Sequence, residues 1–219
     1  MTTTTDKTYL EPYREAVARA GPTWEAQLWR DPEGQAARFD AIARAADLAG
    51  RTIADLGCGR GDLAAFLIER RIAFASYLGV DAIGAMVEEA ARRAHEGGWS
   101  ACSFEVADFV ANTDLGERLV RERGAGTLIV SGSLNTLTQA EAQRTLARFW
   151  DAVEPAGGTL VFNFLCERRG APAQTPGDPA VRFNGAAMLD WALARTREVR
   201  YLRDYLGGHD ATIAMRAHA

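Results

Sequence analysis

Asp55-Leu-Gly-Cys-Gly-Arg-Gly-Asp62 decides the fold of this chain. Its first two residues end the short apolar stretch Arg51–Leu56, which predicts a β-strand. After it, Leu63, Phe66 and Leu67 lie on one face of a predicted helix. Glycines at alternate positions allow the backbone to turn tightly and to approach a ligand closely. The sequence therefore predicts a strand, a glycine loop that contacts a ligand, and a helix.

Strands and helices alternate along the rest of the chain. Further strands are expected at Tyr77–Val80, Ser103–Val106, Thr127–Val130 and Thr159–Phe164, and helices at Gly84–His95, Asp114–Arg123, Gln139–Val153 and Asn184–Arg195. Two more strands, Glu198–Tyr205 and Ala211–Ala217, flank the hairpin signal Leu206-Gly-Gly-His-Asp210. This alternation predicts βαβ units and a largely parallel sheet, that is, an α/β fold.

Ahead of the sheet, two helical regions are expected. The first runs from Tyr9 to about Arg30 and carries the aromatic residues Tyr13, Trp24 and Trp29. The second begins at Asp31-Pro32, with proline in the first turn, and ends near Gly50. The aromatic residues carry more apolar surface than a free arm would expose. We therefore expect the first region to fold over the ligand site, with simple core packing as the alternative.

Three acids follow predicted strands. Asp55 and Asp81 end the first and second strands, and Asp108 comes just after the third. Because the carboxyl ends of parallel strands meet at one edge, these acids should face one crevice. A carboxylate at the position of Asp81 can accept hydrogen bonds from both hydroxyls of a ribose.

The glycine spacing helps to choose among ribose-containing cofactors. It is Gly-x-Gly-x-Gly, whereas dinucleotide sites carry Gly-x-Gly-x-x-Gly. Asp62 also lies where a pyrophosphate would sit at the helix N-terminus, and its carboxylate would repel that group. S-adenosylmethionine has a ribose and a cationic centre but no phosphate, so it fits better.

Composition narrows the function further. The chain has 219 residues, which favours one domain, and 47% are hydrophobic, as in ordinary globular proteins. Lys+Arg 25 against Asp+Glu 29 gives a net charge of −4, which argues against a nucleic-acid partner. The dispersed cysteines Cys58, Cys102 and Cys166 indicate no disulfide framework or metal site. The N-terminus does not resemble a signal peptide, and no stretch could span a membrane, so we expect a cytoplasmic protein.

Together these motifs resemble the class I S-adenosylmethionine-dependent methyltransferases. The matching pieces are the glycine loop, Asp81, Asp108, the end of the fourth strand at Thr127–Asn135, and Glu154-Pro-Ala-Gly-Gly-Thr-Leu160 before the fifth strand. The resemblance covers roughly Gly50 to the last residue. It implies one Rossmann-like, doubly wound sheet with strand order 3-2-1-4-5-7-6, an antiparallel seventh strand and helices on both faces. Residues 1–50 would then form a helical cap, and residues 51–219 the catalytic domain.

The resemblance also implies a role for individual residues. Gly57 and Gly59 would approach the methionine part of the cofactor, and Asp55 would support its amino group through the loop. Asp81 would bind the ribose. The remaining cofactor contacts would come from Cys58 in the loop, Ala82, Ile83, Asp108 and Phe109 around adenine, and Ser131 and Gly132 below the sulfonium. No metal is expected.

No shared catalytic residue is implied, and the weak candidates are His209 and Asn135. If the sixth strand runs parallel to the fifth, the turn containing His209 borders the substrate side, although a plain turn residue is the more common outcome. Gln35 and Arg38 could fold over the crevice, but they are interpreted mainly as a solvated helix face. The Pro/Gly-rich stretch 167–180 is too long for a routine connection and suggests a functional loop, in which Arg168-Arg169 are interpreted as solvated.

The acceptor is the open question. A near-minimal domain with an aromatic N-terminal segment favours a small molecule, methylated on oxygen or nitrogen, of the kind found in secondary metabolism. A protein or RNA methyltransferase is the alternative. From another class, the chain could be a non-catalytic cofactor-binding partner of a second enzyme. The protein is expected to be a monomer or a homodimer that binds neither nucleic acid nor membranes.

Overall fold

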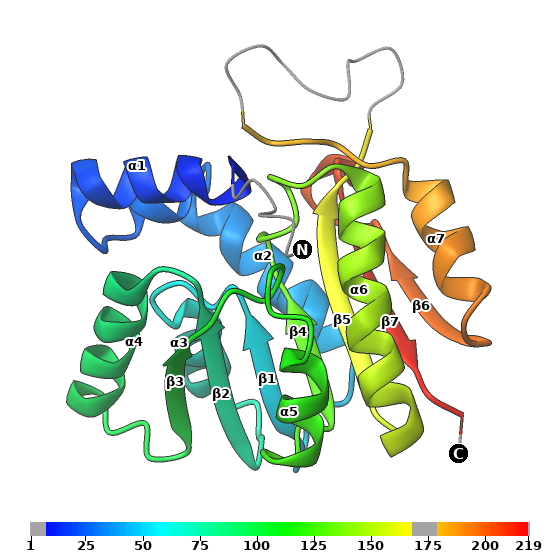
Figure 1. Cartoon of the computed structure of the whole chain (residues 1–219), viewed down its shortest axis with the longest axis horizontal. Helices are drawn as coiled ribbons and strands as arrows, with labels where there is room; N and C mark the ends of the chain where they lie inside the picture. The colour runs from blue at the N-terminus through cyan, green and yellow to red at the C-terminus, as the bar shows by residue number, and fades with distance from the viewer. Residues whose placement is uncertain (1–7, 168–178, 219) are drawn as a thin grey trace, which may run out of the picture.

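The structure is a computed structural model that describes residues 8–167 and 179–218. At its centre is one seven-stranded sheet with strand order β3-β2-β1-β4-β5-β7-β6, as expected (Figure 1). The strands are β1 Thr52–Leu56, β2 Ser76–Asp81, β3 Cys102–Val106, β4 Thr127–Val130, β5 Thr159–Leu165, β6 Glu198–Leu202 and β7 Asp210–Arg216. The first five pair in parallel, whereas β7 pairs antiparallel with both β5 and β6. Consequently β6 runs parallel to β5.

Helices cover both faces of the sheet. They are α1 Glu11–Ala20, α2 Pro32–Ala45, α3 Asp62–Glu69, α4 Gly84–Glu96, α5 Leu115–Arg121, α6 Gln139–Val153 and α7 Gly185–Leu193. Successive strand residues point to opposite faces, so the central strands contribute to two hydrophobic clusters. One cluster joins the sheet to α5, α6 and α7, and the other joins it to α2 and α3. The larger cluster lies on the face of α6, where Phe149 and Trp150 are buried.

The N-terminal region differs in detail from the sequence-based expectation. The first helix is not continuous to Arg30, because it ends at Gly21, which has a left-handed φ of 70° and precedes a proline. The second helix begins as expected, with the Asp31 side chain accepting a hydrogen bond from Gly34 N at 2.6 Å. It ends at Ala45 rather than near Gly50. As Figure 1 shows, α1 lies beyond the carboxyl ends of β1, β2 and β3.

The C-terminal hairpin also forms, with a shorter β6 than expected and with β7 displaced by one residue. β6 ends at Leu202 instead of Tyr205, and a 3₁₀ turn at Leu206–Gly208 leads into β7. Stretch 167–180 is mostly outside the described residues, as are Arg168 and Arg169. In the described part of the chain, no helix is long and apolar enough to cross a membrane.

The capping box of α6 provides a test of local stability. The Thr138 hydroxyl accepts from Glu141 N at 3.3 Å, and the Glu141 carboxylate accepts from Thr138 N at 2.9 Å. Thr138→Ala should therefore lower the free energy of unfolding by about 1 kcal/mol in urea titrations. Thr138→Ser keeps the hydroxyl and should stay close to the wild type; an equal loss in both variants would contradict the capping role.

Candidate active site

The glycine loop joins the ends of the two central strands β1 and β2. The backbone amides of Gly57 and Cys58 both donate to the Val80 carbonyl, at 2.7 and 3.0 Å. Gly59 N then donates to Asp81 Oδ2 at 2.9 Å. Gly57, Gly59 and Gly61 all have positive φ angles of 81°, 53° and 77°, a conformation that side chains rarely adopt. The loop therefore holds the acid at the end of β2 directly against its own backbone.

The surroundings of two of these glycines also differ. A Cβ atom on Gly57 would collide with the Ser133 side chain, whereas one on Gly59 would meet the terminal amide of Gln27, which can move. The loop is thus a cradle of bare backbone, closely approached from β4 on one side and from the N-terminal segment on the other.

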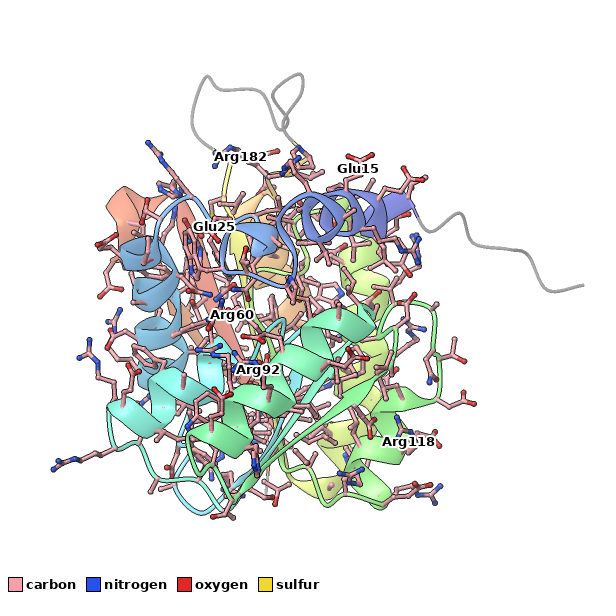
Figure 2. The ribbon with its side chains drawn as sticks, turned by 90° about the vertical axis from the view of Figure 1, so that its left-hand side faces the viewer. Glu15, Glu25, Arg60, Arg92, Arg118 and Arg182 are labelled. Carbon is pink, nitrogen blue, oxygen red and sulfur yellow. The ribbon has the colours of Figure 1, made fainter. Side chains whose placement is uncertain are left out.

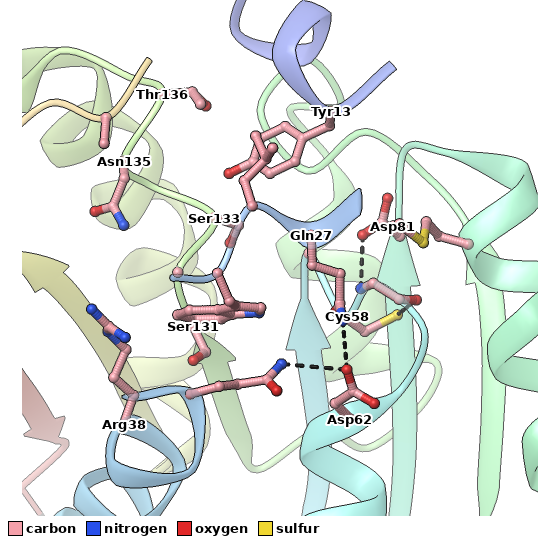
Figure 3. Close-up of a pocket in the computed structure, with 18 of the residues that line it drawn as sticks. Tyr13, Gln27, Arg38, Cys58, Asp62, Asp81, Ser131, Ser133, Asn135 and Thr136 are labelled. Carbon is pink, nitrogen blue, oxygen red and sulfur yellow. Dashed lines mark hydrogen bonds between the residues drawn. The ribbon is translucent and has the colours of Figure 1, made fainter. Parts of the chain in front are cut away.

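A cavity of about 620 Å³ lies over this loop, at the carboxyl ends of the parallel strands. It is bounded by residues from β1, β2 and β5, by the segment after β4, by the N-terminal segment and by the turn before β7 (Figure 3). Every sequence-predicted site residue lines it: Asp55, Gly57, Cys58, Gly59, Asp81, Ala82, Ile83, Asp108, Phe109, Ser131, Gly132, Asn135 and His209. The structure therefore brings the predicted cofactor residues and both catalytic candidates into one cavity.

Asp55 has an unusual environment at the base of the cavity. It is buried, and its Oδ2 accepts a hydrogen bond from the Tyr77 hydroxyl. Its Oδ1 has no hydrogen-bond partner among the described residues. Burial raises the pKa of Asp55 to about 7, opposed by the hydrogen bond from Tyr77 and increased by the nearby charge of Asp81. A donor inside the cavity would satisfy the free oxygen and favour the ionised form.

Asp81 and Asp108 are held by backbone and aromatic donors. Ile83 N donates to Asp81 Oδ1 at 2.9 Å, so each Asp81 oxygen already accepts one backbone N–H. Burial raises the pKa of Asp81, and these backbone bonds oppose the rise. The Tyr9 hydroxyl lies 2.9 and 2.8 Å from the two oxygens of Asp108. Asp81 keeps acceptor capacity, because a carboxylate offers about four lone pairs and its two backbone donors use one on each oxygen.

The N-terminal segment covers the cavity, as expected. Tyr13 and Trp29 both line it, whereas Trp24 does not and donates instead to Gln35 Oε1 at 2.8 Å. The Trp29 ring lies against Gly132 at the end of β4. Gln27 Nε2 donates to Asp62 Oδ2 at 2.5 Å, which fixes this segment to the first turn of α3. Figure 3 shows Gln27 and Tyr13 above the loop that carries Cys58.

The interpretation of Gln35 and Arg38 as a solvated helix face is wrong. Both are buried, with 6% and 7% of their surface exposed, and both line the cavity. Gln35 Nε2 donates to Asp62 Oδ2 at 3.3 Å, and Arg38 Nε donates to Asp210 Oδ1 at 2.5 Å. Because these acids lie 27 and 172 residues away in sequence, helical periodicity could not identify them as partners.

Asn163 is a further residue that the sequence analysis missed. Its side chain is buried and links the end of β4 to β5: Oδ1 accepts from Gly132 N at 2.8 Å, and Nδ2 donates to Ser131 Oγ at 3.1 Å. Asn135 fixes the next residues in a similar way, since its Oδ1 accepts from Leu165 N at 3.3 Å. A lone asparagine within the apolar run Thr159–Leu165 is the signal that could have identified Asn163.

Other chemistry at this site would have to come from the Cys58 thiol or from metal-ligating side chains. Burial and the nearby acids raise the pKa of the Cys58 thiol well above its usual value, so the thiol stays protonated. Across residues 8–167 and 179–218, no cluster of three or more His, Cys, Asp or Glu residues could hold a metal ion.

Comparisons with known proteins identify the domain. Residues 53–157 match the family model described as a methyltransferase domain. The chain carries a methyltransferase domain. The resemblance to class I methyltransferases is thereby confirmed. A search of curated proteins found no significant sequence match.

Solved structures share the fold of this methyltransferase domain at low sequence identity. An O-methyltransferase family protein from Burkholderia thailandensis is 15% identical, with a TM-score of 0.60 over 84% of this chain and 54% of its own. Human N-acetylserotonin methyltransferase in complex with SAM is 18% identical, with a TM-score of 0.63 over 96% of this chain and 60% of its own. The present chain thus spans less than two thirds of the length of both. The [4+2]-cyclase SpnF is 15% identical, with a TM-score of 0.66 over 95% of this chain and 92% of its own.

The raised pKa of Asp55 predicts a pH-dependent loss of stability. Between about pH 4 and pH 7 the unfolded chain releases this proton while the folded protein keeps it, so rising pH favours unfolding through this group. Asp55→Asn can still accept from Tyr77 but does not titrate. From about pH 5 to pH 8, the wild type should lose on the order of 2 kcal/mol of unfolding free energy relative to this variant. If the free energy of unfolding changes with pH in the same way in both proteins, the pKa of Asp55 is not raised.

Proposed function

We propose that this methyltransferase domain binds S-adenosylmethionine in the cavity and transfers its methyl group to the oxygen or nitrogen of a small-molecule acceptor. The observation that carries the proposal is the covered cavity of about 620 Å³, which cofactor and acceptor must share. This volume is within the range of about 300–1,000 Å³ that is usual for small-ligand sites. In the same proposal, residues 1–50 act as the cap and residues 51–219 as the catalytic domain.

The residues at the base of the cavity fit this cofactor. The free Oδ1 of Asp55 needs a donor, and the cofactor's amino group provides one beside the bare backbone of Gly57 and Gly59. Asp81 retains acceptor sites for the two ribose hydroxyls. Adenine would pack on Ala82, Ile83 and Phe109 with its amino group towards Asp108, and the sulfonium would lie above Ser131 and Gly132.

The charges of the cavity favour a cationic cofactor over one with a phosphate. Five acids line it, Glu25, Asp55, Asp62, Asp81 and Asp108, against three arginines, Arg30, Arg38 and Arg182. Asp62 occupies the N-terminus of α3, the position that a pyrophosphate would take in a dinucleotide site, and forms an ion pair with Arg93 at 2.6 Å. Opposite charge attracts the ammonium and sulfonium groups of S-adenosylmethionine, whereas a pyrophosphate would be repelled.

When bound, S-adenosylmethionine supplies a methyl group on a positively charged sulfur, which is a good leaving group. The chain's main contribution is therefore alignment and water exclusion. Gln27 and Trp29 cover the loop and the end of β4, and Asn163 fixes Ser131 and Gly132 below them. These contacts support a bound cofactor whose reactive carbon faces the remaining cavity volume.

Two alternatives are kept for the tests. A protein or RNA methyltransferase would need access for a large substrate. The residues of the N-terminal segment that line the cavity restrict such access, so they disfavour this alternative. The second is a non-catalytic cofactor-binding partner. The structural neighbour SpnF is a [4+2]-cyclase, so this fold also occurs in a protein that is not named as a methyltransferase. Methyl transfer therefore has to be tested directly.

Calorimetry followed by turnover measurements separates these possibilities. We expect S-adenosylmethionine and its demethylated product to bind one site per chain, and a panel of small hydroxylated and amino compounds to include a methyl acceptor. Cofactor binding without turnover, restored only by a second protein, would support the non-catalytic alternative. Turnover on RNA or protein but on no small molecule would contradict the proposed acceptor class.

Asp81 provides the sharpest single-residue test of cofactor binding. Asp81→Asn keeps the size of the side chain but removes its charge and one acceptor, so S-adenosylmethionine binding should weaken by about 2–4 kcal/mol. Asp151→Asn on the exposed side of α6 is the matched control and should bind normally. If folded Asp81→Asn protein keeps wild-type affinity in calorimetry, the ribose assignment is wrong.

A further inference from the structure

A buried charged cluster lies at the end of the cavity nearest β7. It consists of Arg38 on α2 together with His209 and Asp210 at the start of β7. Asp210 is 1% exposed, and its two oxygens contact different partners: Oδ1 is 2.5 Å from Arg38 Nε, and Oδ2 is 2.5 Å from His209 Nδ1. Arg38 and His209 line the cavity, and Asp210 lies behind them.

This cluster is more than an ordinary turn. Polar residues of a hairpin turn usually point into water, whereas the His209 side chain is 19% exposed and forms part of the cavity wall. Burying a carboxylate, a guanidinium and an imidazole costs free energy that an apolar turn would avoid. Arg38 is held in place by its bond to the Gly34 carbonyl at 3.1 Å and by the Trp29 ring, whose centroid lies 5.0 Å from its Cζ. The arrangement therefore fixes Asp210 rather than leaving it free to reorient.

The contact between His209 and Asp210 determines which ring nitrogen faces the cavity. Nδ1 and Oδ2 are buried, and neither has a regular hydrogen bond among the described residues, so their contact is close but bent. Two lone pairs at 2.5 Å would repel each other, whereas a proton on Nδ1 removes this repulsion, so the contact favours the Nδ1–H form of the ring. In the neutral ring, Nε2 is then the unprotonated nitrogen, and no described residue donates to it.

The surroundings of His209 suit an oxygen nucleophile. Cys166 N donates to the His209 carbonyl at 2.8 Å, and Arg182 Nη1 donates to the Cys166 carbonyl at 3.3 Å. The Arg182 guanidinium lines the same cavity as the imidazole, and its positive charge favours a negatively charged oxygen there. Figure 2 shows Arg182 at the same end of the molecule as Glu15 and Glu25, the end where the strands terminate.

Other cavity groups are less suited to accept a proton. Burial raises the pKa of Tyr13 to about 12, with a further contribution from Asp81. Asp55 and Asp81 lie at the base of the cavity, where the proposed function assigns their remaining acceptor sites to the amino group and the ribose of the cofactor. His95 and His218 are exposed and do not line the cavity, so His209 is the one imidazole that does.

We propose that His209 is the general base of this methyltransferase, that Asp210 and Arg38 are its positioning residues, and that the acceptor carries a weakly acidic hydroxyl such as a phenol or enol. This inference rests on the proposed function. A carboxylate or thioether acceptor would need no base. The presence of a His–Asp pair in the cavity wall therefore favours a hydroxyl acceptor, which must lose its proton.

The proposed step balances in atoms and charge. The hydroxyl oxygen forms its new bond to the methyl carbon while the carbon–sulfur bond breaks, and the sulfur leaves with that electron pair as a neutral thioether. The hydroxyl proton passes to His209 Nε2. The resulting imidazolium contacts Asp210, which it shares with Arg38, so the cluster gains one positive charge. The sulfonium loses one positive charge in the same step, so the total charge of the site is unchanged.

The first test measures the proton position and needs no acceptor. The full-length protein, saturated with the demethylated cofactor S-adenosylhomocysteine, is studied by long-range ¹H–¹⁵N NMR at a pH where the histidines are neutral. His209→Gln and His95→Gln variants assign the signals. We expect the Nδ1–H form for His209 and a change towards the Nε2–H form in Asp210→Asn. An Nε2–H form in the wild type would overturn the proposal whether or not the Asp210 variant folds.

The second test uses turnover on phenols and carboxylic acids, followed by release of S-adenosylhomocysteine. His209→Gln should lower kcat for phenols by at least about 100-fold while leaving S-adenosylmethionine affinity unchanged, and the exposed control His95→Gln should retain wild-type kcat. A His209→Gln variant with nearly full kcat, or methylation of carboxylic acids alone, would overturn the inference and leave the proposed function intact. Failure of the wild type to bind S-adenosylmethionine would instead overturn both.

Discussion

The shared hydrogen bonds at the Val80 carbonyl constrain the whole site. Because Gly57 and Cys58 both donate to this one oxygen, the end of β1 and the end of β2 are tied together within two residues of Asp81. Only left-handed backbone angles allow the loop to make these bonds and still enter α3. The position of Asp81, the opening above the loop and the start of α3 at Asp62 all follow from this turn.

Polar contacts, rather than apolar packing alone, attach the N-terminal segment to this frame. Gln27 and Gln35 both donate to Asp62, and Arg93 from α4 contacts the same carboxylate. The associated apolar cluster is small and centres on Ala16, Ala26 and Met86. Segments held by few buried apolar contacts open at low free-energy cost. A cover of this kind suits a site that must admit and release two molecules.

Much of the fold and of the cofactor side was predictable from the sequence, because the relevant signals are local. β4 and α6 have the predicted bounds, Thr127–Val130 and Gln139–Val153, since a buried β-branched run and a capping box mark them directly. The glycine loop and the strand-end acids Asp55 and Asp81 are also found from motif and spacing. Gln35, Arg38 and Asn163 could not be placed in this way, because their roles depend on partners contributed by distant segments. Polar residues at helical spacing look solvated until the fold brings Asp62 and Asp210 to them.

The strand order has a consequence for how the chain becomes a folded protein. β7 follows β6 in sequence but lies between β5 and β6, so neither strand has its neighbour until β7 is inserted. Until then, the buried run of β5 presents an unpaired edge, the kind of surface that promotes association between chains. Its pairing with β7 joins residues about fifty positions apart, and long-range pairings of this kind slow folding. Insertion of β7 also delivers Asp210 to Arg38, so closing the sheet and completing the cavity wall are one event during folding.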